Sequence, residues 1–336
     1  MSTNVNRRWL LASRPSGLVE KQNFQWVEEP VPSIADGEIL VKVLFLSCDP
    51  TQRGWIARDT YMPAVKIGEV VRSGGLGRVV ASKSEAYKEG DLVSGLVGWQ
   101  DYVVLKAGGM FPPAKVPNNV PIPMAMGTFG LTGLTAYFGL LEIGQPKPGE
   151  TVLVSGAAGA TGSIVGQIAR IKGARAIGIA GGKEKCEWLV NEAKFDAAID
   201  YKSEDVSKRV RELAPKGVDV YFDNVGGEQL DIALANLAMH ARVVICGAIS
   251  QYDSTTPVGP KNYMNLLVKR SKMEGFLVAD FMGKAGDAIR ELAGWVGEGK
   301  IKDRFDIAEG LENAPEALRR LFTGENKGKQ LVKIAD

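Results

Sequence analysis

Histidine is almost absent from this chain. The 336 residues include a single histidine, His240, and three scattered cysteines, Cys48, Cys186 and Cys246, with no C-x-x-C pair. A catalytic zinc ion usually takes two or three nitrogen or sulfur ligands from the protein, and Ser-His-Asp or Cys-His hydrolases need an active-site histidine. His240 precedes the apolar run 243–245 and is expected in a surface turn between a helix and a strand. The sequence therefore predicts chemistry that uses neither a metal ion nor histidine.

The chain also lacks a strong excess of charge of either sign and long apolar runs. Lysine and arginine number 41 against 39 aspartates and glutamates, without a basic stripe, so there is no case for nucleic-acid binding. No apolar run reaches the length of a membrane span. Residues 1–8 are polar and lack the hydrophobic core of a signal peptide, and the cysteines indicate no disulfide framework. We expect a cytoplasmic protein of roughly two domains.

The most informative segment is 151–171, TVLVSGAAGATGSIVGQIARI. It is typical of a buried strand, a turn of small residues and an amphipathic helix. A phosphate binds well at such a helix N-terminus, because unpaired N–H groups and the positive end of the helix dipole point at it. The motif departs from G-x-G-x-x-G because Ala157 stands at the first glycine position, and Gly156 is expected to make the tight turn. We predict a dinucleotide site; the alternative is a purely structural turn.

The next predicted strand, 176–180, indicates which dinucleotide. An NAD site places a carboxylate at the end of this strand, but here the sequence continues Gly181-Gly182-Lys183-Glu184-Lys185. A lysine attracts the 2′-phosphate that a carboxylate would repel, so NADP(H) is favoured. The alternative is that Lys183 and Lys185 are solvated charges at a helix start. Tyr201, in the turn after residues 197–200, either lies over the same phosphate or caps a strand.

The chain divides into two regions of different pattern. Residues 1 to about 125 are β-rich, with strands predicted at 38–45, 77–81, 91–95 and 102–105. Five prolines between 112 and 123 exclude a regular helix or central strand and mark a candidate domain border. Alternating strands and helices follow, which predicts parallel strands with helices on both faces. They are strands 151–155, 175–180, 197–200, 218–222 and 242–247 and helices 162–172, 183–192, 204–213 and 227–238.

The last third of the chain adds one further strand at 270–278 and a helix at 283–297. A second helix, 314–322, is expected to take Asn313 as its N-cap, with Pro315 in its first turn. The closing segment 330–334 has the pattern of a strand. Because one isolated strand cannot bury itself, we expect it to return to the first domain.

Together, several motifs resemble the medium-chain dehydrogenase/reductases, and within them the zinc-free leukotriene B4 dehydrogenase/prostaglandin reductase and alkenal double-bond reductase branch. The resemblance covers nearly the whole chain. It implies an α/β protein with a GroES-like β-rich domain at 1–125, completed by 310–336, and a Rossmann domain with a doubly wound parallel sheet at 126–309. The motifs are LSCDP at 46–50 with Arg53, GGLGRVV at 74–80, GWQDY at 98–102, AAGATG at 157–162, YFDNVGG at 221–227, CGAISQY at 246–252 and GENKGK at 324–329.

The same resemblance implies a set of cofactor contacts and a homodimer. The contacts are Gly159, Ala160, Thr161 and Gly162 for the pyrophosphate, Lys185 and Tyr201 for the 2′-phosphate, and Asn224, Cys246, Gly247, Ala248, Ile249, Ser250, Tyr252, Phe276, Leu277, Val278 and Asn326 for the nicotinamide half. The residue pattern agrees in outline, because Asn224 and Cys246 follow predicted strands at the end where ligands of open α/β sheets bind. Asn224 and Asn326 have the alternative of being ordinary turn residues.

The expected reaction is NADPH-dependent reduction of the C=C bond of α,β-unsaturated ketones or aldehydes. Hydride addition to the β-carbon places negative charge on the carbonyl oxygen, which a hydrogen-bond donor stabilises. Tyr252 is the candidate catalytic donor, and the proton for the α-carbon comes either from Tyr252 or from water. Thr51 stands where the family often has tyrosine, and Tyr61 is the candidate substrate contact that replaces it. The alternatives are an NADPH:quinone oxidoreductase and a non-catalytic NADPH-binding redox sensor.

Overall fold

The computed structural model describes residues 5–109, 112–254, 256 and 258–336, so the first four residues of the polar N-terminal segment lie outside the described part. The chain forms two compact units. Unit 1 comprises Met1–Met126 and Phe305–Asp336, and unit 2 comprises Gly127–Arg304. No helix of the described residues has both the length and the apolar character needed to cross a bilayer.

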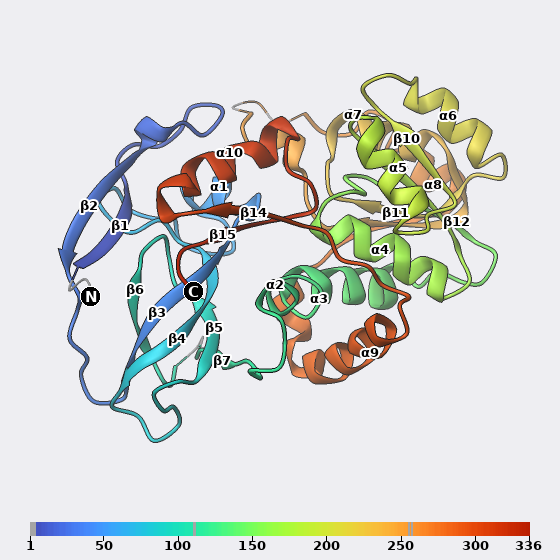
Figure 1. Cartoon of the computed structure of the whole chain (residues 1–336). Helices are drawn as coiled ribbons and strands as arrows, with labels where there is room; N and C mark the ends of the chain where they lie inside the picture. The colour runs from blue at the N-terminus through green and yellow to red at the C-terminus, as the bar shows by residue number, and fades with distance from the viewer. Residues whose placement is uncertain (1–4, 110–111, 255, 257) are drawn as a thin grey trace. The chain divides into compact units, whose positions relative to one another are not determined.

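Unit 1 is built on β-sheets, as the sequence predicts (Figure 1). In β3 the side chains of Ile39, Val41 and Val43 alternate into the core, which is the period of a half-buried strand. The closing strand pairs antiparallel with β3, which confirms its expected return to the first domain. The main sheet has the order β14-β15-β3-β4-β5-β7, with β6 also on β3, and β1 and β2 form a separate hairpin. The strands are β1 (Val5–Leu11), β2 (Phe24–Pro30), β3 (Glu38–Ser47), β4 (Gly74–Ser82), β5 (Leu92–Leu96), β6 (Tyr102–Lys106), β7 (Ala114–Lys115), β14 (Phe305–Glu309) and β15 (Lys329–Lys333).

The helical segments of unit 1 are short apart from the last one. They are η1 (Lys21–Asn23), α1 (Thr51–Trp55), α2 (Ile122–Met126), η5 (Leu311–Asn313) and α10 (Ala314–Thr323). The proline-rich interval 112–123 contains the two-residue strand β7 at the sheet edge, and its last two residues open α2, with Pro123 in the first turn of that helix, so the expected exclusion of a helix fails at the end of the interval. Strand β14 belongs to unit 1 because it pairs with β15, whereas residues 305–309 were expected in the Rossmann domain.

Unit 2 is a six-stranded parallel sheet with helices on both faces, which confirms the predicted doubly wound fold. Val152 and Val154 of β8 pack with α4 and α9, whereas Leu153 between them packs with α6 and α7. The sheet order is β10-β9-β8-β11-β12-β13, so the direction of winding reverses between β8 and β11. The strands are β8 (Thr151–Val154), β9 (Arg175–Ala180), β10 (Ala197–Asp200), β11 (Val218–Asp223), β12 (Leu237–Ile245) and β13 (Lys272–Gly275).

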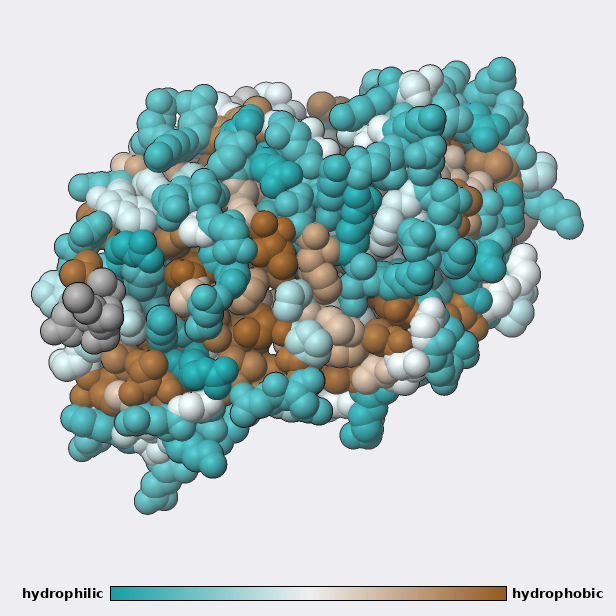
Figure 2. All heavy atoms as spheres, in the orientation of Figure 1, coloured by the Kyte–Doolittle hydropathy of each residue, from teal (hydrophilic) through white to brown (hydrophobic). Residues whose placement is uncertain are grey.

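The helices of unit 2 mostly bury one face. In α6 only Val210 is fully buried, and the surface over α5 and α6 in Figure 2 is mostly hydrophilic. The helical segments are α3 (Leu131–Phe138), η2 (Gly139–Gly144), α4 (Ala160–Ile171), α5 (Lys183–Asn191), α6 (Val206–Leu213), α7 (Gly227–Ala235), η3 (Ile249–Gln251), α8 (Asn265–Lys269), η4 (Val278–Lys284) and α9 (Ala285–Gly297).

Three predictions about local structure are wrong. His240 lies inside β12 at φ +60°, where the pairing with β11 shifts between Val218 and Val220, so it sits in a bulge rather than in a helix-to-strand turn. The strand predicted at 270–278 is only β13, and the chain enters η4 at Val278. Asn313 precedes α10, but its side chain makes no capping bond and donates instead to the carbonyl of Glu309 at 2.6 Å.

Candidate active site

The turn between β8 and α4 has the geometry that a phosphate site needs. Gly156 has φ +57°, which confirms that it makes the tight turn. A Cβ on Gly162 would lie 2.5 Å from the carbonyl oxygen of Gly156 and 2.9 Å from the Cα of Ala157, so this position admits only glycine. The first-turn N–H groups of Ala160, Thr161 and Gly162 have no helical partner by geometry. The residues present therefore fit a dinucleotide pyrophosphate.

This turn lies where the winding of the sheet reverses, because β8 and β11 are neighbours whose chains continue in different directions. Ligands of open α/β sheets bind at this point, beyond the carboxyl ends of the strands. Residues after the two strands contact each other directly. The N–H of Asn224 donates to Ser155 Oγ at 2.8 Å, and the Asn224 amide donates to the Ser155 carbonyl at 2.7 Å. The predicted contacts at Asn224 and at the glycine turn are thus brought together.

Asp223, the last residue of β11, is a functional candidate that the sequence analysis quoted in a motif without giving it a role. Its side chain is buried. One carboxylate oxygen accepts hydrogen bonds from Ser155 Oγ, the Tyr221 hydroxyl and the N–H groups of Val225 and Gly226, all at 2.9–3.0 Å. Burial raises the pKa of Asp223, and the donors oppose that shift without cancelling it. The sequence signal was an acidic residue at the carboxyl end of a mostly apolar strand.

The loop after β12 carries Tyr252 and packs on the residues after β11. Two backbone hydrogen bonds join the segments. The N–H of Ile249 donates to the carbonyl of Asn224 at 3.2 Å, and the N–H of Ser250 donates to the carbonyl of Val225 at 3.1 Å. The half-buried Tyr252 follows η3, and its hydroxyl oxygen accepts the N–H of Ala248 at 3.2 Å. An accepted hydrogen bond polarises a hydroxyl toward donating its own proton. The segments containing Asn224 and Tyr252 therefore form one connected loop pair.

The predicted 2′-phosphate contacts lie around the end of β9. Gly182, with φ +97°, precedes α5, and Lys185 is half-buried in its first turn. The Tyr201 ring lies over Gly181, since a Cβ on that glycine would be 2.7 Å from the phenol oxygen. Asp200, the last residue of β10, is bonded to this turn, because its carboxylate accepts the N–H of Gly182 at 2.7 Å. Burial acts to raise the pKa of Asp200, but the backbone donors outweigh it and the pKa is lowered.

The segment 276–278 is not a strand but a packed corner of unit 2. Phe276 lies edge-on to Phe222 with ring centroids 6.4 Å apart, and a Cβ on Gly139 would meet its ring at 2.4 Å. Leu277 is exposed and Val278 begins η4. Phe276 is thus fixed against the end of β11, the strand that leads into Asn224.

Two predicted contacts belong to unit 1. The Tyr61 hydroxyl and Thr51 Oγ1 are 2.7 Å apart, and the Tyr61 ring lies edge-on to Trp55. Thr51, which stands at the family's usual tyrosine position, therefore anchors another phenol. Asn326 lies in the turn before β15, where its side-chain amide donates to the Gly328 carbonyl at 2.9 Å.

Burial makes all three thiols weak acids. It raises the pKa of Cys48 and Cys246 to about 12 and that of Cys186 to about 11. The thiolate is the reactive form. At neutral pH these side chains are therefore protonated and poorly nucleophilic.

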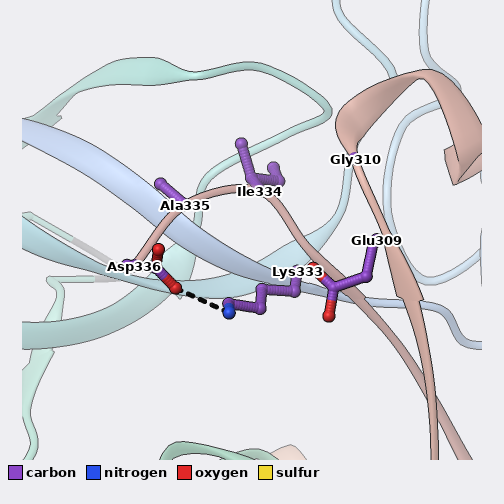
Figure 3. A pocket seen from close by; sticks show the side chains of 6 residues that line it. All are labelled: Glu309, Gly310, Lys333, Ile334, Ala335 and Asp336. Atoms are coloured by element: carbon purple, nitrogen blue, oxygen red, sulfur yellow. Dashed lines mark ion pairs between the residues drawn. The ribbon is translucent and has the colours of Figure 1, made fainter.

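In the described residues, no group of three or more His, Cys, Asp or Glu side chains is arranged to hold a metal ion. The donor set therefore does not fit a zinc centre. A small surface hollow in unit 1, at the ends of β14 and β15, is lined by Glu309, Gly310 and residues 333–336 (Figure 3). The Lys333–Asp336 ion pair at 2.6 Å lies along it, with Asp336 almost fully exposed. None of the predicted site residues lines this hollow.

Comparisons with known proteins match both parts of the chain. Residues 7–112 match the N-terminal domain of oxidoreductase family, and residues 160–294 match a family described as zinc-binding dehydrogenase. The chain is 40% identical to the NADPH-dependent curcumin reductase of Escherichia coli over 98% of its length and 97% of that protein. It is 39% identical to the NADP(+)-dependent 2-alkenal reductase of Nicotiana tabacum, covering 89% of this chain and 88% of that protein.

Among solved structures, CurA of Vibrio vulnificus in complex with NADPH is 40% identical, covers 98% of this chain and 99% of that chain, and has a TM-score of 0.92. The prostaglandin reductase 1 of Bos taurus is 39% identical over 97% of this chain and 98% of that protein. The chain belongs to the alkenal and prostaglandin reductase branch of the medium-chain dehydrogenase/reductases. The description of the second matched family mentions zinc, but the part of the chain that the structure describes contains no group of three or more His, Cys, Asp or Glu side chains that could hold a metal ion. The family assignment predicted from the motifs is confirmed.

Proposed function

We propose that this protein is an NADPH-dependent reductase of the C=C bond of α,β-unsaturated ketones and aldehydes. The observation that carries the proposal is one connected loop pair at the winding reversal of the sheet, with a phosphate-type glycine turn beside it and the Tyr252 phenol on it. Relatives named as curcumin and 2-alkenal reductases support it. An alkenal carries its C=C bond conjugated to a carbonyl, the arrangement that this reaction requires.

Unit 2 is assigned to NADP(H) and unit 1 to substrate. Residues 159–162 would hold the pyrophosphate, Lys185 and Tyr201 the 2′-phosphate, and Asn224, residues 246–252 and Phe276–Val278 the nicotinamide half; Asn326 is a further candidate contact for the cofactor. Support comes from the tight approach at Gly162, the glycine-lined turn before α5 and the absence of a carboxylate directly at the end of β9. An ammonium group at Lys185 attracts a 2′-phosphate. When bound, NADPH supplies the hydride.

Tyr252 acts as the hydrogen-bond donor to the substrate carbonyl oxygen. Negative charge grows on that oxygen as the β-carbon is reduced, so the bond strengthens in the transition state. The N–H of Ala248 on the phenol oxygen pre-orients the side chain and supports this donation. In unit 1, Tyr61 is a candidate substrate contact, and its side chain is held by Thr51 and Trp55. A rigid aromatic side chain contacts an apolar enone at little entropic cost.

The test is NADPH consumption with trans-2-alkenals, enones and quinones. Oxidation of NADPH by enals and enones supports the proposal. Turnover of quinones alone would replace it with a quinone reductase, and tight NADPH binding without turnover would replace it with a binding protein. A thiol-based redox sensor is disfavoured by the raised thiol pKa values.

The Tyr252→Phe variant tests the donor. We expect enone turnover to fall by well over tenfold, about 2 kcal/mol or more of transition-state stabilisation, with NADPH affinity nearly unchanged. Tyr263→Phe, at an exposed tyrosine of the same unit, is the matched control and should behave as wild type. Full activity in Tyr252→Phe would remove Tyr252 from the mechanism.

We also propose that the protein is a homodimer through the outer edge of unit 2. Strand β13 ends the six-stranded sheet, so its outer backbone groups have no neighbouring strand among the described residues. Leu267 and Val268 of α8 are 72% and 61% exposed, and Met264 and Met273 are also exposed nearby in sequence. An unpaired edge flanked by apolar residues suits a second copy related by two-fold symmetry.

Sedimentation at micromolar concentration tests the oligomeric state. We expect a dimer for the wild type and a monomer for Leu267→Glu, with Leu131→Glu, at an exposed leucine of α3, as the control. A monomeric wild type would refute the dimer.

A cytoplasmic location is proposed as well, and it is supported by three unpaired thiols. Fractionation of cells tests this location.

A further inference from the structure

We propose that Asp223 is a positioning residue that holds the Tyr252 loop and Asn224 in register with the glycine turn. It is not assigned contact with substrate or with reacting atoms. The positioning role is argued from hydrogen bonds within unit 2. Its effect on catalysis rests on the proposed function.

The side chain of Asp223 joins two neighbouring strand ends. Its one carboxylate oxygen accepts from Ser155 Oγ, which follows β8, and from Tyr221, Val225 and Gly226, all at 2.9–3.0 Å. A carboxylate offers about four acceptor sites on two oxygens, and its negative charge makes each bond stronger than a neutral one. A neutral amide oxygen in the same place would bind the four donors more weakly. The four bonds to one oxygen therefore favour an aspartate here.

The main chain of Asp223 continues the connection to the next loop. Its carbonyl oxygen accepts the N–H groups of Cys246 and Gly247 at 2.9 and 3.0 Å. The following carbonyls, of Asn224 and Val225, accept from Ile249 and Ser250. The loop that carries Tyr252 is thus bonded residue by residue to the segment that the Asp223 side chain orients.

Ser155 links Asp223 and Asn224 to the glycine turn between β8 and α4. Its hydroxyl donates to Asp223 and accepts the N–H of Asn224 at 2.8 Å, so one hydroxyl sets both residues. Tyr221 and Asp223 are buried, and burial raises the pKa of both. A site must be held within a fraction of an ångström for efficient hydride transfer. Loss of the carboxylate should therefore misplace the nicotinamide-side loops and leave the opposite end of the cofactor site intact.

The experiment compares two ligands in Asp223→Asn. The amide oxygen of asparagine carries no negative charge, so the four hydrogen bonds that Asp223 Oδ1 accepts all become weaker. We expect NADPH to bind about tenfold more weakly, whereas 2′,5′-ADP, which lacks the nicotinamide half, binds as to wild type. With NADPH deuterated at the transferred position, the isotope effect on enone reduction should increase, because hydride transfer becomes slower relative to the other steps.

Two further variants separate positioning from loss of structure. Tyr221→Phe removes one donor at nearly constant volume and should give the same pattern more weakly, by about threefold. Asp303→Asn alters another carboxyl of unit 2, which is half-buried and accepts a hydrogen bond from Thr128, and should leave the ratio of NADPH to 2′,5′-ADP affinity unchanged.

Equal weakening of both ligands in Asp223→Asn, or wild-type affinity for NADPH, would overturn the proposal. Both binding measurements are independent of enone turnover. A failure of the enone assay in the wild type would therefore count against the proposed function and not against the role of Asp223.

Discussion

The approach of Gly162 to the preceding turn supports a quantitative prediction. A Cβ at this position would lie 2.5 Å from the Gly156 oxygen and 3.0 Å from its carbonyl carbon, and these backbone atoms cannot rotate away. In Gly162→Ala the start of α4 must therefore shift. Overpacking of this kind costs about 1–3 kcal/mol of stability. A shift that breaks one hydrogen bond to a charged phosphate costs about 1.5–3 kcal/mol of binding, or roughly 10- to 100-fold in the NADPH dissociation constant.

Gly166 of the same helix provides the matched control. A Cβ there would lie 1.9 Å from the ring of Phe195, so Gly166→Ala also overpacks unit 2, but away from the glycine turn. Urea unfolding and fluorescence titration with NADPH should find both variants destabilised and only Gly162→Ala impaired in binding beyond tenfold. Equal losses of affinity in the two variants, or normal binding by Gly162→Ala, would refute the assignment of this turn to the pyrophosphate.

Three further predictions concern charge and burial. Lys185→Ala should reduce the preference for NADPH over NADH by about tenfold in titrations, whereas Lys183→Ala, at an exposed lysine paired with Glu187, should not. The Cys246 thiol should resist labelling by a disulfide reagent at pH 8, because burial raises its pKa to about 12. The raised pKa also contributes to the free energy of unfolding. This contribution is fully present below the ordinary thiol pKa of 9.0 and is lost as the pH rises toward about 12. Asp49→Ala leaves the buried Lys329 ammonium without its carboxylate at 2.6 Å and should cost about 3 kcal/mol in urea unfolding.

The regular parts of unit 2 were predictable because their signals are local. Strands such as 175–180 and 197–200 are short apolar runs between breakers, and the structure has them at the predicted residues. The hairpin of β1 and β2 was missed because its pattern is mixed. Asn6 occupies a buried position of β1, where its side-chain amide exchanges two hydrogen bonds with the backbone of Tyr102. A buried polar residue satisfied by a partner 96 positions away gives no local strand signal.

In the candidate site, too, residues with a local sequence signal were predictable and residues that depend on distant partners were not. The glycine turn, Lys185 and the residues after β11 and β12 were located from motifs, because each lies at a strand end that the sequence marks. Asp223 was not assigned, since its role depends on Ser155, 68 positions earlier, and on the N–H groups of the following turn. The Thr51–Tyr61 hydrogen bond was likewise inaccessible, although both residues had been noted.

By itself the sequence determined the family, the strand–helix alternation and the residue types at the cofactor turn, because these depend on spacing along the chain. The tertiary structure decided which polar side chains form hydrogen bonds and ion pairs with each other. The packing of β8 beside β11 brings Ser155 to Asp223, and the pairing of β15 with β3 closes unit 1 and buries Lys329 against Asp49. Hydrogen bonds between distant segments exist only once the sheets have formed, and no local pattern encodes them.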